Sequence, residues 1–532
     1  MKHYTAFSLF YLLGIFLWGL GYLAILPPFE GFDESSHYSG IREIADTGKL
    51  PVYGKSRIDT VVTDYQNNAP SPYGTLNPPF DQNITYFKFF ARPDRIDSYI
   101  TTYRNTPIAH SYIPSDNLSW EAQHAPLYYL LLAPFEIISE KLSLVTQIFM
   151  LRLGSFLIAL AGIALALYAA RHSPEALLGF AVYPILFPMF FPEFARLGND
   201  SLSMLVCAVL ALLVRRYSRD ISNSNLYLAL GVTLGIGLLT KAFFIPITAA
   251  IAVWLFASNT VLNPRHMPRT IENVGLLLMT AIVTGGFWYV YKLANHVPIV
   301  GFEEPQTLAE QGGLVAGLRQ HFSVLGMLQG FAVNFVTWIW AGTWSLARMH
   351  ALLYAPIILL AVLVLIAFAM KLKEKPLADP AWLTVFLFGF FALGFLRHMV
   401  ISLAIKGIGN TPAWYLHILL PFAAPCIGIG ITTLLRHTWG NIIIKILLAL
   451  AGLFQLAAIW SQVALFSGCA TKGTDKYYVF SNDSFCLDKT GRIFNNLSVL
   501  AWPHLALVGF GGGLICLCIV IYRMGTLREE KN

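Results

Sequence analysis

The sequence predicts an all-α protein that crosses a membrane many times. Of its 532 residues, 56% are hydrophobic and only 12% carry a charge, a balance that excludes an ordinary soluble domain. Apolar runs of roughly 17 to 25 residues recur along most of the chain, and each is long enough to cross about 30 Å of hydrocarbon. Because backbone polar groups inside a bilayer must be bonded internally, each run is expected to be a helix.

About twelve spans are predicted from these runs. The first run is too long for a signal peptide and is followed by Pro27 and Pro28 rather than by small residues, so it is expected to stay in the protein. The predicted spans are residues 7–27, 144–170, 175–193, 199–215, 222–240, 241–257, 272–295, 350–370, 380–404, 412–434, 441–466 and 499–521.

Basic residues predict which ends of these spans face the cytoplasm. With a cytoplasmic amino terminus, the segments RHSPE, RRYSRD, NPRHMPR, KLKEK, LLRHTWGNIIIK and the carboxyl-terminal tail all fall on one side. Cytoplasmic loops carry such a Lys/Arg excess, so both termini are predicted to be cytoplasmic. The net charge of +7 is spread over these short loops, which favours a role in topology over nucleic-acid binding.

Three large segments then lie on the outer side, at residues 28–143, 296–349 and 467–498. Cys469 and Cys486 share the last of them and are predicted to form a disulfide, because the outer side is oxidising.

The expected domain organisation follows from these loops. An N-terminal transmembrane module spans 1–295 and includes the first outer loop, the outer loop 296–349 follows, and 350–532 holds the C-terminal helices. Within the first outer loop, residues 35–48 and 125–139 have the character of amphipathic or short apolar helices lying on the membrane. Residues 51–118 have no sustained period and are predicted to be a long loop over a site.

The stretch EGFDESSH places Asp33 and Glu34 directly after the first span. A carboxylate in a roofed cavity here could serve as a general base, provided that it lies within about 3 Å of an acceptor hydroxyl. The same acids could equally cap the helix that starts near Ser35, because acids favour a helix amino terminus.

Further polar residues gather near other outer ends of spans. Glu121 and His124 precede an apolar helix, where His124 could bind a phosphate or merely sit in the interfacial belt. Asp200 follows Glu193 and Arg196 in a tight outer connection, where it could also be a helix cap.

Isolated cations are the remaining signal. Lys241 stands alone between two apolar segments, and a lysine there either meets a partner or extends toward the interface. Arg397 lies inside a predicted span, where a buried guanidinium needs an anion, a pairing carboxylate or a polar bundle. Lys406 and His417 flank the outer turn that follows.

Together these motifs resemble the GT-C superfamily of integral-membrane glycosyltransferases, which take sugars from polyprenyl-phosphate donors. The resemblance rests on FDESSH, EAQHAPLYYLLLAP, LGNDSLSML, LLTKAFFIP and WYLHILLP, which follow that family's usual order along most of the chain. It is nearest to the bacterial aminoarabinose transferases and the protein mannosyltransferases. It implies a GT-C-like bundle in a bacterial inner membrane, with the site facing the periplasm.

The resemblance also implies a role for each candidate residue. Asp33 would be the catalytic base assisted by Glu34, and Asp200 would bind the acceptor or shape the site. This chain departs from the family at His124, where relatives carry a Lys, and after Tyr415, where relatives carry an Arg. The implied donor-phosphate ligands are Lys241, Arg397, His124, His417 and Lys406, and the implied cavity residues are His37, Glu121, Tyr128, Arg196 and Tyr415.

The implied reaction is an inverting transfer, in which an acceptor hydroxyl attacks the anomeric carbon and polyprenyl phosphate leaves. The implied partners are the lipid-linked sugar donor, membrane lipids and a glycan, lipid or protein acceptor, with no nucleic acid. No obligatory cofactor is expected; a Mg²⁺ or Mn²⁺ ion could be held if Glu30, Asp33, Glu193 and Asp200 converge.

Other classes of function remain open at this stage. A lipid-linked glycan transporter or flippase also places polar residues inside helices, although no inverted repeat stands out in the sequence. An outer-face glycan polymerase or ligase, or a structural subunit that positions partners, would carry similar features.

Overall fold

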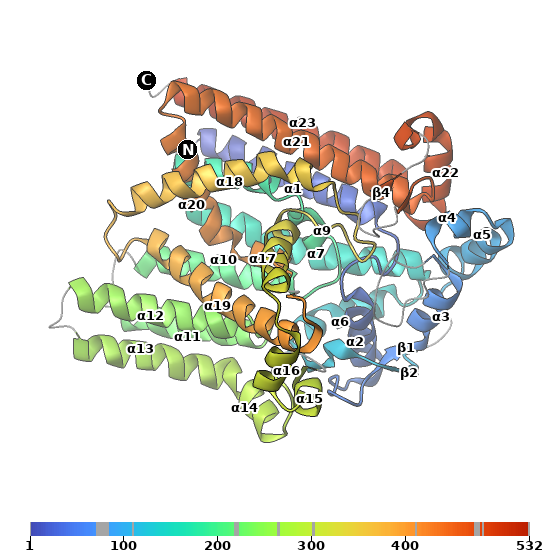
Figure 1. Ribbon diagram of the computed structural model, residues 1–532, viewed down its shortest axis with the longest axis horizontal. Coiled ribbons are helices and arrows are strands. Elements are labelled where there is room, and N and C mark those ends of the chain that lie inside the picture. Colours follow the sequence, from blue (N-terminus) through green and yellow to red (C-terminus); the bar gives the residue numbers. More distant parts are fainter. Residues whose placement is uncertain are drawn as a thin grey trace.

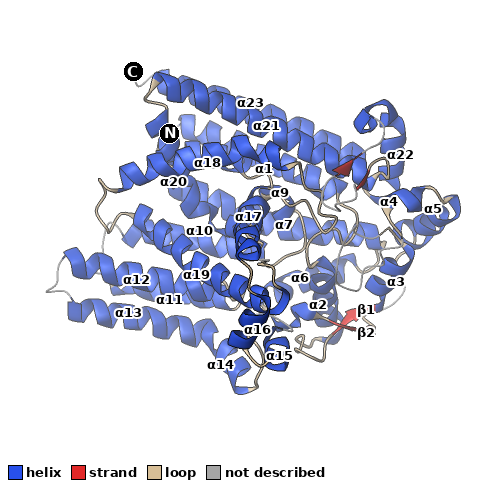
Figure 2. Cartoon of the chain, in the orientation of Figure 1, coloured by secondary structure: helices blue, strands red, loops and turns tan. Residues whose placement is uncertain are grey.

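The long helices of the protein run side by side in one bundle (Figure 1). The computed structural model describes residues 2–70, 84–108, 111–217, 223–262, 267–299, 304–409, 412–472, 479–480 and 484–529. The amino end of the first helix and the carboxyl end of the last lie at one end of the bundle, here called the terminal end. Short helices and the strands gather toward the opposite end, here called the loop end (Figure 2).

A helix occupies each predicted span. These helices are α1 (Lys2–Ile25), α7 (Leu144–Ala170), α8 (Pro174–Leu186), α10 (Asp200–Tyr217), α11 (Ser224–Leu238), α12 (Phe244–Leu262), α13 (Met267–Ala281) continued by η4 (Ile282–Gly286) and α14 (Phe287–Ala294), α18 (Ala351–Leu372), α19 (Pro380–Lys406), α20 (Leu420–Leu434), α21 (Thr438–Phe466) and α23 (Pro503–Glu529). In the described part of the chain, nine helices are long and apolar enough to cross a membrane. Of the others, α8 and α11 have only 13 and 15 residues, and α10 carries charges at both ends. The chain is therefore an all-α polytopic membrane protein.

The loop end is more ordered than the sequence predicted. The helices of the first loop are α2 (Glu34–Thr47), α3 (Thr60–Asn68), α4 (Tyr86–Phe90), α5 (Pro93–Tyr99), η1 (Ile100–Asn105), η2 (Trp120–Gln123) and α6 (Leu127–Ser139). Its antiparallel strands are β1 (Arg57–Asp59) and β2 (Pro114–Leu118), which pair Arg57 with Leu118. The expectation of an irregular loop over 51–118 was thus wrong for residues 51–70, 84–108 and 111–118, because these elements are too short to give a sustained sequence period. Residues 71–83 and 109–110 of that range lie outside the described residues.

The other connections also contain short elements. They are α9 (Phe190–Phe194), α15 (Glu304–Glu310), α16 (Leu314–His321), α17 (Val324–Ile339), η5 (Trp414–Leu419), β3 (Thr471–Lys472), β4 (Val479–Phe480), η6 (Ser484–Lys489) and α22 (Thr490–Leu500). Residues 296–349, predicted as a loop, therefore hold three helices, and α16 and α17 meet at a bend of 102°. The predicted disulfide between Cys469 and Cys486 is present near the loop end, with Cα atoms 6.1 Å apart.

Local sequence signals set the ends of α19. The Asp379 carboxylate accepts a hydrogen bond from the Ala381 amide at 2.9 Å, and Pro380 occupies the first helical position. At the other end Gly407 adopts a left-handed φ of 69°, which terminates the helix. These caps explain why the predicted span 380–404 agrees with the observed helix.

Two glycines let α8 and α20 pack at close range. A Cβ atom on Gly179 would lie 1.6 Å from the Ala424 carbonyl oxygen, and one on Gly428 would lie 1.7 Å from the Glu175 carbonyl oxygen. Small residues at such a crossing allow two membrane helices to approach backbone to backbone. The contact joins the N-terminal helices to the C-terminal helices.

Candidate functional site

Asp33 lies in the turn between α1 and α2, at the loop end. Its backbone is left-handed, with φ 59°, a conformation that few residues other than glycine adopt and that costs free energy. Its side chain does not cap α2 but accepts a hydrogen bond from Trp120 Nε1 at 3.2 Å. Asp33 is partly exposed, whereas Glu30 and Glu34 on either side of it are fully buried. The side-chain capping role considered for Asp33 is therefore wrong, and the residue is less enclosed than Glu30 and Glu34.

Glu34 is held by an arginine from α7. Arg152 donates to both carboxylate oxygens, at 2.6 and 2.5 Å, and also donates to the carbonyl oxygens of Leu26 and Pro27. The amide of Leu197 adds a third donor to Glu34 at 3.0 Å. With both charged partners buried, Glu34 fixes the turn and is not available as a base. Arg152 was missed at the sequence level, although it is the only charged residue in the predicted span 144–170.

Asp200 binds two cations at the start of α10. Lys241 Nζ lies 2.8 Å from each Asp200 oxygen, and Arg196 Nη2 lies 3.0 Å from Asp200 Oδ2. Arg196 also binds Glu193 at 2.6 Å and the Phe32 carbonyl at 2.9 Å. Asp200 is therefore a buried ion-pair partner, and Arg196 ties this cluster to the residue next to Asp33.

Aromatic rings surround Lys241 and continue beside Asp33. Lys241 Nζ lies 4.6 Å from the Phe243 ring centre and 4.5 Å from that of Tyr415, within cation–π range. Phe32 stacks on Trp414, with ring centres 4.0 Å apart, and meets Trp344 edge to face at 5.2 Å. These rings form an aromatic wall next to the cluster.

Glu30 anchors the segment that carries part of this wall. Its carboxylate accepts from Tyr86 at 2.5 Å and from the Thr343 and Ser345 hydroxyls at 2.7 Å, and its carbonyl accepts from the Trp344 amide at 3.0 Å. These bonds hold the connection between α17 and α18 against the first loop. Thr343 and Ser345 carry no signal in the sequence, because they meet Glu30 only through the tertiary fold.

The remaining first-loop candidates form a second group. Glu121 contacts His124, and the His124 ring stacks on His37 with ring centres 6.3 Å apart. His37 Nδ1 lies 2.9 Å from the Tyr129 hydroxyl. Tyr128 lies at the back of the group, where its hydroxyl accepts from the Gly198 amide at 2.9 Å. His37 is buried with most of α2, so this helix is enclosed rather than lying on the membrane. Tyr128 is buried too, but α6 keeps an exposed apolar face that includes Ile138, as expected of a helix lying on a membrane.

Burial and neighbouring charges separate the pKa values of three first-loop groups. Burial and the negative charge of Glu121 raise the pKa of Asp33 to about 6, although Arg196 and Lys241 oppose the shift. Burial also tends to raise the pKa of Glu121, but His124 outweighs it and lowers the value to about 2. Burial lowers the pKa of His37 to about 3. Asp33 is thus the group of the three that changes protonation near neutral pH, as a general base should.

Three predicted phosphate ligands lie outside this arrangement. Arg397 is exposed on α19, so the buried guanidinium considered for it is not observed, and Lys406 is exposed at the end of the same helix. His417 is buried in η5, just before α20, and its Nδ1 lies 3.1 Å from the Tyr183 hydroxyl. Hydropathy cannot tell which face of a helix points inward, and that explains why Arg397 was considered to be buried; its role as a phosphate ligand stays a prediction. Within the described ranges, no group of three or more Asp, Glu, His or Cys residues is placed to hold a metal ion, so the four acids considered for Mg²⁺ do not converge in that way.

The raised pKa predicts an acid limit to activity. A base must be deprotonated, so if Asp33 acts as one, kcat/KM is expected to fall about tenfold per pH unit below pH 6. Because the charge of Glu121 helps to raise the pKa of Asp33, the Glu121→Gln variant should show the acid-side fall of kcat/KM at lower pH than the parent. Profiles of kcat/KM against pH for the parent and for Glu121→Gln check the expectation. An acid-side fall at the same pH in both, or at higher pH in the variant, would contradict it.

The fold and the cluster define a class: a polytopic all-α membrane protein with a buried ion-pair network around a partly exposed carboxylate at one end of its bundle. Within that class, the chain belongs to the family described as "Predicted membrane protein (DUF2142)", whose model matches residues 16–319. No curated protein matches the sequence.

Solved structures similar to this chain include ArnT from Cupriavidus metallidurans in two states. The structure bound to undecaprenyl phosphate has 13% identity and a TM-score of 0.46, covering 97% of this chain and 77% of that one. The apo structure has 12% identity and a TM-score of 0.43, covering 97% and 76%.

Proposed function

We propose that the protein is a glycosyltransferase of the GT-C type, which moves a sugar from a polyprenyl-phosphate donor to an acceptor hydroxyl with inversion. The observation that carries the proposal is Asp33: a partly exposed carboxylate with a pKa near 6, fixed in a strained turn among buried ion pairs. Strained backbone and perturbed pKa values concentrate at functional sites.

The roles divide between the acid and the cations. Asp33 removes the proton of the acceptor hydroxyl as it attacks the anomeric carbon. The departing phosphate is already an anion, so it needs positive charge more than a proton donor. Lys241 supplies that charge, while Asp200 and the Phe243 and Tyr415 rings hold its ammonium group in place.

The same proposal gives the protein an orientation. The disulfide between Cys469 and Cys486 lies near the loop end and favours an oxidising compartment there. The site would then face the periplasm of a bacterial inner membrane, with both termini in the cytoplasm. The Lys/Arg excess of the short loops at the terminal end supports this orientation.

A transporter of lipid-linked glycans is the second candidate. It is favoured by α16 and α17, which together form either a broken span or a re-entrant segment. Discontinuous helices of this kind build substrate sites in many transporters.

One experiment separates the two candidates. The full chain in proteoliposomes is supplied with a labelled polyprenyl-phosphate hexose and an extract of envelope acceptors, and both cleavage and transbilayer movement of the donor are followed. We expect release of polyprenyl phosphate together with transfer of the label. Movement of intact donor without cleavage would replace the transferase proposal with the transporter.

A further inference from the structure

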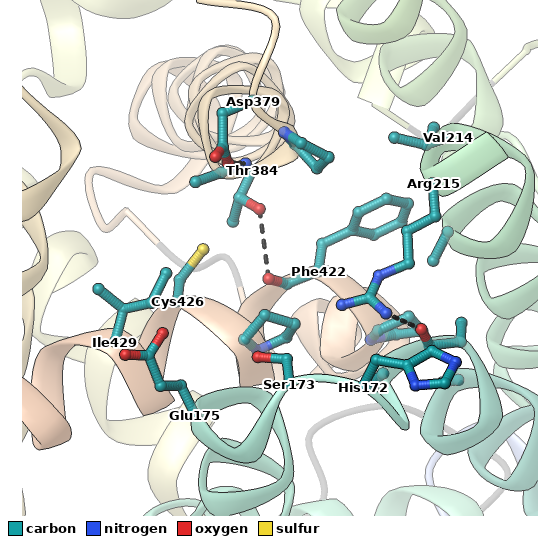
Figure 3. Close-up of a pocket in the computed structure, with 18 of the residues that line it drawn as sticks. His172, Ser173, Glu175, Val214, Arg215, Asp379, Thr384, Phe422, Cys426 and Ile429 are labelled. Atoms are coloured by element: carbon teal, nitrogen blue, oxygen red, sulfur yellow. Dashed lines mark hydrogen bonds between the residues drawn. The ribbon is translucent and has the colours of Figure 1, made fainter. Parts of the chain in front are cut away.

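A pocket of about 380 Å³ opens at the terminal end of the bundle, between the ends of α7, α8 and α10 on one side and α19 and α20 on the other (Figure 3). Its arginine and lysine side chains are bound within the protein. Arg215 donates to the Ala169 carbonyl, and Lys375 pairs with Asp379 at 2.7 Å. No residue assigned to sugar transfer lines this pocket. A buried lysine of α14, by contrast, reaches the segment beside Asp33.

That lysine, Lys292, lies in the last turn of α14. Its Nζ donates to the Gln123 carbonyl at 2.9 Å and to the Ile299 carbonyl at 3.2 Å. In the part of the chain that the structure describes, no carboxylate lies within ion-pair distance of its ammonium group. A buried charge is costly unless it is paired, and residues that break this rule are expected at functional sites. Lys292 is therefore a candidate for a role beyond packing.

Gln123 is the last residue of η2, which lies beside Asp33. The first residue of η2, Trp120, donates to Asp33 Oδ1 at 3.2 Å. The second, Glu121, is buried, and its negative charge acts on Asp33. A shift of η2 would therefore move both a hydrogen bond and a charge that face the proposed base.

Other elements hold η2 in place. A helix of four residues makes too few internal bonds to be stable alone, and its last carbonyls have no partner inside the helix. At its start, the Ser119 amide donates to the Ser56 carbonyl at 3.0 Å. At its end, Lys292 binds the Gln123 carbonyl from 169 positions away. The lysine thus attaches the end of η2 to a helix of the bundle.

The same face of α14 also holds the segment that carries Lys241. Tyr289 and Lys292 are neighbours on one face of the helix, with Lys292 Nζ 6.0 Å from the Tyr289 ring centre. The Tyr289 hydroxyl donates to the Leu238 carbonyl at 3.1 Å, at the end of α11 and shortly before Lys241. The helix α14 therefore contacts both the segment next to Asp33 and the segment that carries Lys241.

We propose that Lys292 is a positioning residue for sugar transfer, which fixes η2 so that Trp120 and Glu121 keep their places beside Asp33. It acts through η2 and does not touch the substrate. A cation suits this task better than a neutral donor, because hydrogen bonds from charged donors are roughly twice as strong. The inference rests on the proposed function in taking Asp33 as the base; the attachment of η2 to Lys292 does not depend on it.

Loss of this attachment should change the pKa of Asp33. The charges that act on Asp33 are Glu121 from η2, Arg196 before α10 and Lys241 after α11. Burial and Glu121 raise the pKa, and both effects weaken if η2 moves away. The Trp120 hydrogen bond lowers the pKa but is a smaller influence than Glu121. The net result is a lower pKa, so the base stays deprotonated to lower pH.

Hydrogen exchange of the purified full chain in detergent tests the attachment. The variant is Lys292→Met, which removes the ammonium group and keeps most of the side-chain length. Lys88→Met is the matched control, because Lys88 is an exposed lysine on α4 in the first loop. We expect the peptide covering residues 119–124 to exchange at least about tenfold faster in Lys292→Met. The peptide covering α3 should exchange at the parental rate in both variants, because α3 has its own cap at Asp59.

Profiles of kcat/KM against pH test the effect on sugar transfer. In Lys292→Met the acid-side fall should occur at lower pH than in the parent. At neutral pH, kcat should be about tenfold lower and the donor KM should stay within about twofold, since a small displacement of a reacting group costs rate. Lys292→Arg keeps a donor for each carbonyl and should retain the parental exchange and profile.

Unchanged exchange of residues 119–124 in Lys292→Met, or an acid-side fall at the parental pH, would overturn the inference. Faster exchange throughout the chain would also overturn it, because it would mean a general loss of stability. Equal effects of Lys292→Arg and Lys292→Met would do the same. If the parent itself transfers no sugar, the glycosyltransferase proposal fails, and faster exchange in Lys292→Met still shows that Lys292 anchors η2.

Discussion

Asp33→Asn is expected to lower sugar transfer by at least about 100-fold, which is the low end of what a positioned general base contributes. Asparagine keeps the size of the side chain and can still accept the Trp120 hydrogen bond through its amide oxygen. It cannot accept the hydroxyl proton. The variant should fold as well as the parent, because the change removes a carboxylate that is repelled by Glu121 and disfavoured by burial.

Transfer from a labelled polyprenyl-phosphate hexose, at matched protein levels, measures the effect. Asp64→Asn is the control, since Asp64 is an exposed acid on α3 in the same loop and should keep the parental rate. An unchanged rate for Asp33→Asn would remove Asp33 as the base. Attention would then turn to Glu121 rather than to Glu34 or Asp200, both of which are bound by buried cations.

Hydropathy was sufficient to place the long helices, because an apolar run of membrane length has few alternatives to a helix. It could not place the short helices of the first loop. Segments such as α4, with 5 residues, owe their structure to packing and to single caps, such as the Thr85 hydroxyl that accepts from the Lys88 amide at 3.3 Å.

The candidate site was predictable in part. Motifs near the ends of spans identified Asp33, Asp200 and Lys241, which the fold brings into one electrostatic cluster. Their pairing was not predictable, because Lys241 lies 41 positions from Asp200 and Arg152 lies 118 positions from Glu34. A lone arginine in an apolar span signals that a partner exists, but only the fold tells which one.

The pairing of Glu34 with Arg152 distinguishes Glu34 from Asp33, although the two acids are adjacent in sequence. Glu34 points to Arg152 and the Leu197 amide and is fully buried, whereas Asp33 points to Trp120 and is partly exposed. The left-handed backbone at Asp33 turns consecutive side chains in different directions. One acid therefore supports the turn, and the other is left less enclosed, as the proposed base requires.

Arg152→Leu is expected to lower the free energy of unfolding by about 3 to 5 kcal/mol, the usual cost of leaving one partner of a buried ion pair alone. The change leaves the Glu34 carboxylate without its bidentate partner and the carbonyl oxygens of Leu26 and Pro27 without a donor. The thermal midpoint of the purified protein in detergent measures the loss. Arg397→Leu is the control, because Arg397 is an arginine in a predicted span that lies exposed on α19.

A double variant separates the charge from the packing. Glu34→Met with Arg152→Met removes both charges at similar volume, so it should recover much of the stability that Arg152→Leu loses. Sugar transfer should not recover with it, since the Glu34 and Arg152 bonds set the direction of the turn that presents Asp33. Recovery of both stability and transfer would mean that the Glu34–Arg152 ion pair is not needed to position Asp33. Recovery of stability alone would mean that this ion pair orients the turn that carries Asp33.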